Sequence, residues 1–283
     1  MARAQCLCGD VVWEIEPPLV FVHDCHCSRC RKSCGSACVR MAGVPAERFR
    51  FVHGADRLAH FQAAPEGLSR AFCRRCGSPG PGEEMAGLVF SPLGALEGDF
   101  EAPNEAHIFA ASKAPWYEIR DGAPTYDAFP PGLELSVLPD VPRPPKTPGR
   151  TGGSCLCGRV AWEIEGKPIL MRYCHCLRCR RARQTSHAAN ALVARDQLEW
   201  TAGELDVVLF KLPGAQRFSQ AFCPDCGGKA PWLVDVRDAW NVPLGNLDGD
   251  PGARPSEHIF VGSKAPWFEI TDDLPQWDEY SKS

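Results

Sequence analysis

Short stretches in which apolar and polar residues alternate recur along the chain, and long amphipathic helical periods are absent. Alternation with a period of two is typical of strands that bury one face. The clearest stretches come in pairs, at 11–16 and 160–165, at 49–52 and 198–201, and at 58–62 and 207–211. Helices are expected only over 28–33 and 177–183, and both would be short. The pattern predicts a mostly β protein built from small antiparallel sheets.

The pairing of these stretches reflects a tandem repeat. Three blocks that contain cysteine occur twice in the same order, at 6–11 and 155–160, at 25–31 and 174–180, and at 71–77 and 221–227. The offset between copies is 149 residues for the first two blocks and 150 for the third. Self-similarity at a fixed offset indicates a duplicated structural unit.

A proline-rich segment separates the two copies. Seven of the residues between 130 and 148 are proline, and proline continues neither a strand ladder nor a helix. We therefore predict a first zinc-binding domain over 1–129, a linker over 130–150 and a second zinc-binding domain over 151–283. Each domain has the usual size of an independent fold.

Composition and charge exclude several classes of function. The chain has 283 residues, of which 44% are hydrophobic and 23% charged, with a net charge of -4. These values are ordinary for a globular protein and argue against non-specific binding to nucleic acid or an anionic membrane, which needs a basic surface. No apolar run approaches the ~20 residues of a membrane span, and no signal sequence is evident. We expect a cytoplasmic protein with reduced thiols.

The sixteen cysteines favour metal binding over disulfides. They are grouped as C-x-C and C-x-x-C, and such close spacing suits one metal ion better than separate bridges. Two short chelating turns far apart in sequence can form a closed four-thiolate zinc site. A redox role for C-x-x-C is the alternative, but the surrounding βαβ pattern is missing. Each copy then has one such site, formed by Cys6, Cys8, Cys73 and Cys76, and by Cys155, Cys157, Cys223 and Cys226.

The sequence C-H-C-x-x-C predicts a second kind of site in each copy. Three thiolates within six residues can bind one zinc ion and leave its fourth position open. Three sulfur ligands make zinc a poor activator of water but a good seat for a soft ligand such as a substrate thiol. The alternative is a second structural zinc, completed by an outside ligand or a partner. The candidate catalytic groups are Cys25, Cys27 and Cys30, and Cys174, Cys176 and Cys179.

Two sets of basic residues are candidates for holding the anionic thiol. Arg31 and Lys32, and in the second copy Arg180 and Arg181, directly follow the last cysteine of each C-H-C-x-x-C block. A further repeated block, at 107–116 and 258–267, supplies a histidine and a lysine that would lie at the pocket mouth. Its alternative reading is a structural strand and corner around a buried tryptophan. The four residues of this set are His107, Lys113, His258 and Lys264.

The copies differ beside the three-cysteine block. Cys34 and Cys38 in the first copy correspond to Arg183 and His187 in the second. Cys34 could close the first site as a fourth ligand, or it could be a small buried apolar residue. Since a closed site excludes a substrate thiol and arginine stabilises an anion, we expect the second copy to bind the thiol more tightly.

With these blocks identified, the chain resembles the glutathione-dependent formaldehyde-activating enzyme family, which also contains centromere protein V. The matching motifs are G-x-C-x-C-G-x-V at 153–160, C-H-C-x-x-C-R, F-C-x-x-C-G and H-I-F-x-x-S-K-x-P-W. The resemblance implies two tandem β-tent domains, each with a structural zinc on its four cysteines and a catalytic-type zinc on its three. It also implies the condensation of glutathione with formaldehyde, classed as a carbon–sulfur lyase reaction.

The sequence thus predicts up to four zinc ions and a thiol cosubstrate, glutathione or a relative, that adds to formaldehyde or another small aldehyde. The expected partners are these small molecules, with no nucleic acid and no membrane, and the oligomeric state is left open. The alternative function is a non-catalytic zinc module that carries thiol adducts or mediates protein contacts. A nucleic-acid-binding zinc ribbon is disfavoured by the acidic charge balance.

Overall fold

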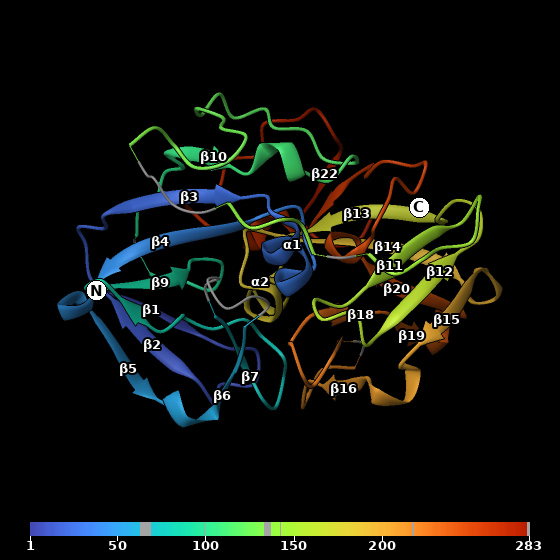
Figure 1. Ribbon diagram of the computed structural model, residues 1–283, viewed down its shortest axis with the longest axis horizontal. Helices are drawn as coiled ribbons and strands as arrows, with labels where there is room; N and C mark the ends of the chain where they lie inside the picture. Colours follow the sequence, from blue (N-terminus) through green and yellow to red (C-terminus); the bar gives the residue numbers. More distant parts are fainter. Residues whose placement is uncertain (63–68, 99, 133–136, 142, 217, 282–283) are drawn as a thin grey trace.

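The computed structural model describes residues 1–62, 69–98, 100–132, 137–141, 143–216 and 218–281 (Figure 1). Within these residues the regular structure is mostly β, as the alternation predicts. The two α-helices are α1 (Ser28–Cys34) and α2 (Leu177–Arg183), in the places expected from the sequence. Both lie near the middle of the molecule, between the first and second halves of the chain (Figure 1).

The first half forms three small sheets. Two of them, β1–β2–β5 and the hairpin β6–β7, are antiparallel, and the third has the order β10–β3–β4–β9–β8. In this third sheet β10 pairs with β3 in parallel, so the sheet is mixed rather than wholly antiparallel. The strands are β1 (Ala2–Gln5), β2 (Val12–Ile15), β3 (Phe21–Cys25), β4 (Val39–Pro45), β5 (Phe49–His53), β6 (Leu58–Phe61), β7 (Arg70–Cys73), β8 (Glu84–Met85), β9 (Leu88–Pro92) and β10 (Ala106–Ile108).

The second half repeats this arrangement. Its sheets have the orders β11–β12–β15, β16–β17–β18 and β19–β20–β14–β13–β21–β22, and β21 again pairs in parallel with β13. The strands are β11 (Thr151–Ser154), β12 (Ala161–Ile164), β13 (Leu170–Cys174), β14 (Ala188–Ala194), β15 (Leu198–Ala202), β16 (Val208–Lys211), β17 (Ser219–Phe222), β18 (Lys229–Ala230), β19 (Trp232–Val234), β20 (Ala239–Pro243), β21 (His258–Ile259) and β22 (Gln276–Trp277).

Short 3-10 helices connect many of these strands. They are η1 (Ala46–Arg48), η2 (Ala55–Arg57), η3 (Ala110–Ser112), η4 (Arg195–Gln197), η5 (Glu204–Asp206), η6 (Asp235–Arg237), η7 (Leu244–Asn246) and η8 (Val261–Ser263). None of the helices in the described part of the chain is long and apolar enough to cross a membrane.

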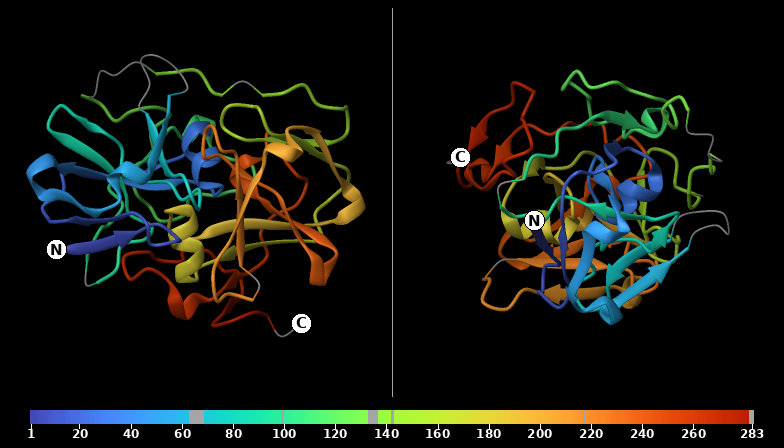
Figure 2. Two further views of the ribbon diagram at one scale, coloured as in Figure 1. Left: turned by 90° about the horizontal axis from the view of Figure 1, so that it is seen from below. Right: turned by 90° about the vertical axis from the view of Figure 1, so that its left-hand side faces the viewer.

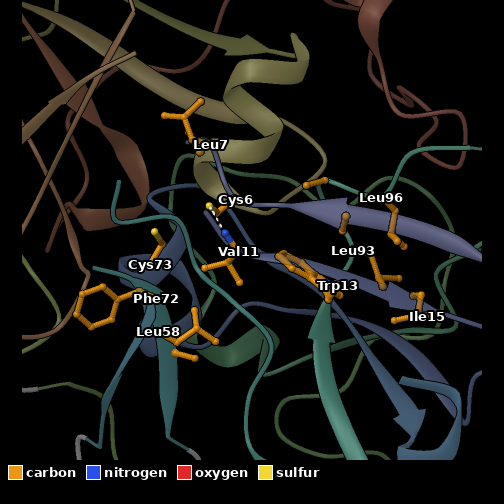
Figure 3. Close-up of a cluster of buried hydrophobic side chains, with 14 of the residues drawn as sticks. Cys6, Leu7, Val11, Trp13, Ile15, Leu58, Phe72, Cys73, Leu93 and Leu96 are labelled. Carbon is orange, nitrogen blue, oxygen red and sulfur yellow. Dashed lines mark hydrogen bonds between the residues drawn. The ribbon is translucent and has the colours of Figure 1, made fainter. Parts of the chain in front are cut away.

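Each half has its own apolar core around an equivalent tryptophan. Trp13 on β2 and Trp162 on β12 are both completely buried. The Trp13 indole donates a hydrogen bond to the Ser91 hydroxyl at 3.1 Å, which satisfies its one polar group. Figure 3 shows Cys6 and Cys73 next to this cluster, so the predicted metal ligands are anchored on the core.

One tryptophan from each half packs in or against the core of the other half. Trp116 of the first half packs in the core of the second half, and Trp267 of the second half packs against the core of the first. The rings of Phe72 and Phe222 also meet across the boundary, 6.5 Å apart. The halves therefore lie side by side as one packed body (Figure 2), and their apolar surfaces complete each other.

Glycines let the helices approach the opposite half closely. An added Cβ at Gly245 would lie 2.3 Å from the Ser36 carbonyl oxygen, and one at Gly94 would lie 1.9 Å from the Thr185 amide nitrogen. These contacts leave no room for any side chain at either position. The equivalent places of Gly94 and Gly245 in the two halves make the interface nearly symmetric.

Candidate metal centres

The structure brings together both predicted four-cysteine groups. Within each group the sulfur atoms all lie within 4.8 Å of one another. Neighbouring sulfurs are 3.4 Å apart for Cys6 and Cys8, and 3.7 Å apart for Cys8 and Cys73. In an ideal zinc tetrahedron with bonds of ~2.3 Å the sulfurs are about 3.8 Å apart, so the spacing fits a structural zinc ion.

Local backbone geometry aims these sulfurs inward. The turn after β1 places Gly9 at a φ of 81°, and the turn after β7 places Gly77 at 70°, in the left-handed region that glycine adopts without strain. The amide of Val11 donates to the Cys6 sulfur at 3.3 Å (Figure 3), and the amide of Val160 does the same for Cys155. Amide donors of this kind stabilise a thiolate.

The structure also brings together the two three-cysteine groups. Their sulfurs lie within 4.8 Å of one another, and Cys25 and Cys27 are 3.5 Å apart. Cys25 ends β3, Cys27 caps α1, and Cys30 lies in the first turn of that helix. The amide of Cys30 donates to the Cys27 sulfur at 3.4 Å, and the second half repeats this bond between Cys179 and Cys176.

The charge balance of the first three-cysteine group calls for a cation. Contact with the Cys27 sulfur raises the pKa of Cys25 well above its usual value, while contact with Cys25 lowers the pKa of Cys27. Crowded thiols share protons in this way because adjacent negative charges repel. A metal ion would allow all three to ionise, so the donor set fits a zinc ion with one open position.

Cys34 does not belong to the first group. Its sulfur accepts a hydrogen bond from the Ser36 amide at 3.3 Å and is completely buried, and burial raises its pKa to about 11. Cys38 is buried as well. Both residues therefore match the apolar alternative rather than the fourth-ligand alternative.

The basic residues after each cysteine block have partners in the opposite half. Lys32 forms a buried ion pair with Asp248 at 2.7 Å, and Arg31 donates to the Gly245 carbonyl at 3.3 Å. In the second half Arg180 donates to a carbonyl of the first half at 3.0 Å, and Arg181 pairs with the carboxylate of Glu97. A thiol-binding role for these four stays a prediction, and these contacts do not support it.

The histidines of the repeated blocks form hydrogen-bonded pairs next to the three-cysteine groups. In the first half His26 and His107 share a hydrogen bond of 2.9 Å, and the Asp121 carboxylate accepts from His107 at 2.7 Å. His175 and His258 make the corresponding bond of 2.8 Å in the second half. Burial lowers the pKa of His26 to about 4, so this imidazole is neutral at physiological pH. These hydrogen bonds fix the orientation of the imidazole ring that lies between two candidate ligands in each three-cysteine block.

The lysines of the same block donate hydrogen bonds to backbone carbonyls of their own turns. Lys113 donates to the carbonyl of Tyr117, and Lys264 donates to that of Phe268, each four residues further along the chain. The structure thus places these lysines against their own turns rather than beside the sulfurs. Their predicted place at the pocket mouth remains untested.

Arg70 is a cation at the first group that the sequence analysis did not identify. Its guanidinium donates to the Cys30 sulfur at 3.4 Å, and the sulfurs, Cys30 first, raise the pKa of Arg70. The equivalent residue in the second half is Gln220, which donates instead to the Cys76 carbonyl at 2.6 Å. The only sequence signal was this difference, directly before a block that otherwise repeats.

A cavity of about 220 Å³ opens beside the first group. Cys30 and Arg70 lie in its wall, together with the apolar side chains of Met41 and Phe90. Polar groups on the wall come from Ser33, Ser69, Glu83 and Glu84. Both three-cysteine groups pack against aromatic rings, the first against Phe109 and Tyr126 and the second against Phe218 and Phe260. The first three-cysteine group thus combines a cavity with a cation.

Comparison with known proteins places this arrangement in a family. The family described as glutathione-dependent formaldehyde-activating enzyme matches residues 1–112 and 150–263, once for each half. The chain belongs to this family, as a tandem duplication. This confirms the resemblance predicted from the four repeated motifs.

Two individual proteins are similar to parts of the chain. A protein of Halomonas elongata, named as a candidate glutathione-dependent formaldehyde-activating enzyme, is 30% identical over 136 residues, which cover 42% of this chain and 81% of that protein. A crystal structure of a Rhodobacter sphaeroides protein is 26% identical and covers 35% of this chain and 90% of its own, with a TM-score of 0.29.

Proposed function

We propose that the chain binds glutathione, or a similar thiol, at the open three-cysteine site of the first half and adds it to formaldehyde. The observation that supports this best is the cavity beside Cys30, whose wall carries the guanidinium of Arg70. Family membership supports a glutathione-dependent activation of formaldehyde. The lyase class, the zinc content and the choice of half are parts of the proposal.

The reaction needs an ionised sulfur held next to a small carbonyl compound. When bound at the three cysteines, zinc would supply positive charge that lowers the pKa of a thiol beside it. Arg70 adds a second positive charge close to this position, because its guanidinium donates a hydrogen bond to the Cys30 sulfur. The carboxylates of Glu83 and Glu84 in the cavity wall have the charge needed to bind the ammonium group of glutathione.

The chemical step forms one bond. The thiol proton leaves for solvent on binding, and the sulfur then attacks the carbonyl carbon of the aldehyde. The carbon–sulfur bond forms as the carbonyl π bond breaks, and the oxygen takes a proton from solvent. The product is the hydroxymethyl thioether, a hemithioacetal, with no net change in oxidation state. The main contribution of the chain is to hold the two reactants together.

The proposal is tested by comparing matched cysteine variants. Protein prepared without chelator should contain up to four zinc ions, and its rate of adduct formation from glutathione and formaldehyde should exceed the spontaneous rate, measured by exchange NMR. Cys30→Ser should abolish the excess rate and Cys179→Ser should retain most of it. Glutathione binding without any excess rate would instead make the protein a carrier of the thiol, and loss with Cys179→Ser alone would move the site to the second half.

A further inference from the structure

Part of the predicted linker is bound to the start of helix α1. The amide of Val141 donates a hydrogen bond to the Ser28 hydroxyl at 3.0 Å, and the Arg29 guanidinium donates to the Pro139 carbonyl at 2.7 Å. These bonds join residues that are 113 and 110 positions apart in the sequence. We call residues 139–141 the strap, because they lie against the first residues of this helix (Figure 1).

The strap contacts fall on the turn that sets the spacing of two candidate metal ligands. Ser28 and Arg29 are the residues between Cys27 and Cys30. The Cys30 amide donates to the Cys27 sulfur at 3.4 Å, so the turn is also closed by its own backbone. A metal ion bound by both sulfurs can leave only when one of them moves away, and the strap bonds oppose that opening of the turn.

The strap is itself anchored on the second half. Val141 is 6% exposed and packs in the core of that half. Two positions further on, Arg143 donates to the Asp248 carbonyl at 3.1 Å, and the Asp248 carboxylate forms the buried ion pair with Lys32 of α1. Because the segment is already fixed at this end, it loses little further conformational freedom when it binds the turn. Its two hydrogen bonds can therefore act as a restraint.

The second three-cysteine turn lacks these contacts. Its corresponding residues are Leu177, whose side chain cannot accept a hydrogen bond, and Arg178, which is exposed. Within the described part of the chain the Arg178 side chain makes no hydrogen bond or ion pair. Cys176 is half-buried, whereas its counterpart Cys27 is buried. The two turns share their cysteine spacing and differ in what holds them from outside.

We infer that the strap holds the ligand turn of the first group closed, so that this group retains a metal ion roughly tenfold longer than the second, the lower limit of what contacts outside the ligands contribute to metal affinity. Ser28 and Arg29 are then positioning residues that act through Cys27 and Cys30. The inference rests on metal binding by the three-cysteine groups, which is part of the proposed function, and not on the thiol reaction. It gives the linker a role beside joining the repeats.

Metal release from each group can be followed by alkylation. The full-length, zinc-containing protein is mixed with a chelator and iodoacetamide, and mass spectrometry of the digested protein distinguishes the cysteines of the first group from those of the second. In the unaltered protein the three cysteines of the first group should be labelled roughly tenfold more slowly than those of the second. Equal rates of labelling would overturn the inference.

Two variants remove the strap contacts from opposite sides. Ser28→Ala combined with Arg29→Ala removes the side-chain partners on the turn. Val141→Pro removes the amide donor of the strap and leaves the sequence of the turn unchanged. Each variant should bring the labelling of the first group towards the rate of the second, and leave the second group and both four-cysteine groups unchanged. Arg178→Ala, the counterpart of Arg29→Ala, should alter none of these rates.

The other cysteine groups separate a local restraint from a general role in folding. Faster labelling of all four groups in both variants would show that the strap serves the fold only, and unchanged labelling of the first group would show that it does not hold the turn. Either result contradicts the inference. The rate of adduct formation tests the proposed function separately: zinc-containing protein that catalyses the reaction but shows no difference in metal release keeps the proposed function and rejects the strap. Protein without zinc would reject both.

Discussion

Single residues account for most of the difference between the two three-cysteine groups. The sequence led us to expect tighter thiol binding in the second half, because Cys34 could close the first site and Arg183 could assist the second. In the structure Cys34 lies outside the three-sulfur group, and the direct cation is Arg70 in the first half. The balance of contacts therefore favours the first half.

Replacing Arg70 by the residue found at the equivalent position tests its role. Arg70→Gln removes a charged donor next to the Cys30 sulfur and should lower the catalysed rate of adduct formation and the affinity for glutathione. Hydrogen bonds to charged groups contribute about 1.5–3 kcal/mol, and the partly open position puts the loss near the lower limit, roughly tenfold. The exposed Arg74→Gln is the matched control. Unchanged binding and rate in Arg70→Gln would show that the guanidinium serves the fold only.

The two cysteines outside the metal groups should be the least reactive thiols. Burial raises the pKa of Cys34 to about 11 and that of Cys38 well above its usual value, so at pH 7.5 almost none of either is thiolate. We expect iodoacetamide, followed by mass spectrometry, to leave both unmodified in the native protein even after a chelator exposes the other cysteines. Labelling of Cys34 should accelerate as the pH rises towards 11. Rapid labelling of Cys34 at neutral pH would contradict its buried placement.

At the scale of elements, the features that depend on local sequence patterns were predicted from the sequence. The alternating stretches became strands, and both short helices formed where expected, since apolar alternation and the cysteine turns are local signals. The grouping of the cysteines was also predictable, because the chelating spacing can be read from the sequence. The parallel pairing of β10 with β3 was not, nor was the use of Arg31, Lys32 and Arg180 at the interface, since both depend on which surfaces meet in three dimensions.

The contact between α1 and η7 should be sensitive to a single added side chain. At Gly245 a Cβ would lie 2.3 Å from the Ser36 carbonyl oxygen, so Gly245→Val must push the two halves apart. Overpacking of this kind costs about 1–3 kcal/mol, to be measured as the free energy of unfolding in urea. The control is Gly152→Ala, where the nearest atom to the new Cβ, on Lys146, would be at an ordinary 3.5 Å. Equal stability of the two variants would mean that the halves are not held in this contact.

At the scale of the whole molecule, duplication has produced one structure rather than two linked ones. The exchanged tryptophans leave each core incomplete without the other half. The turns of the two four-cysteine groups are also joined directly: Gln220 donates to the Cys76 carbonyl at 2.6 Å, and the buried Lys229 ammonium contacts the carbonyls of Gly77 and Gly227. A change at one four-cysteine group should therefore affect the other.

This coupling predicts how loss of one structural site affects stability. Cys223→Ser removes a candidate ligand from the second half only, and metal binding to a four-cysteine site is part of the folding free energy. If the halves were independent, calorimetry would show two transitions, with that of the first half unshifted. Because the turns and cores are shared, we expect a single transition at a lower temperature and earlier zinc release from both four-cysteine groups. Cys176→Ser, in a three-cysteine group, should shift this transition much less. The three cysteines of that group lie within six consecutive residues, so a metal ion there would not join distant segments of the chain. A separate, unshifted transition of the first half would show that the contacts between the halves are too weak to unite them.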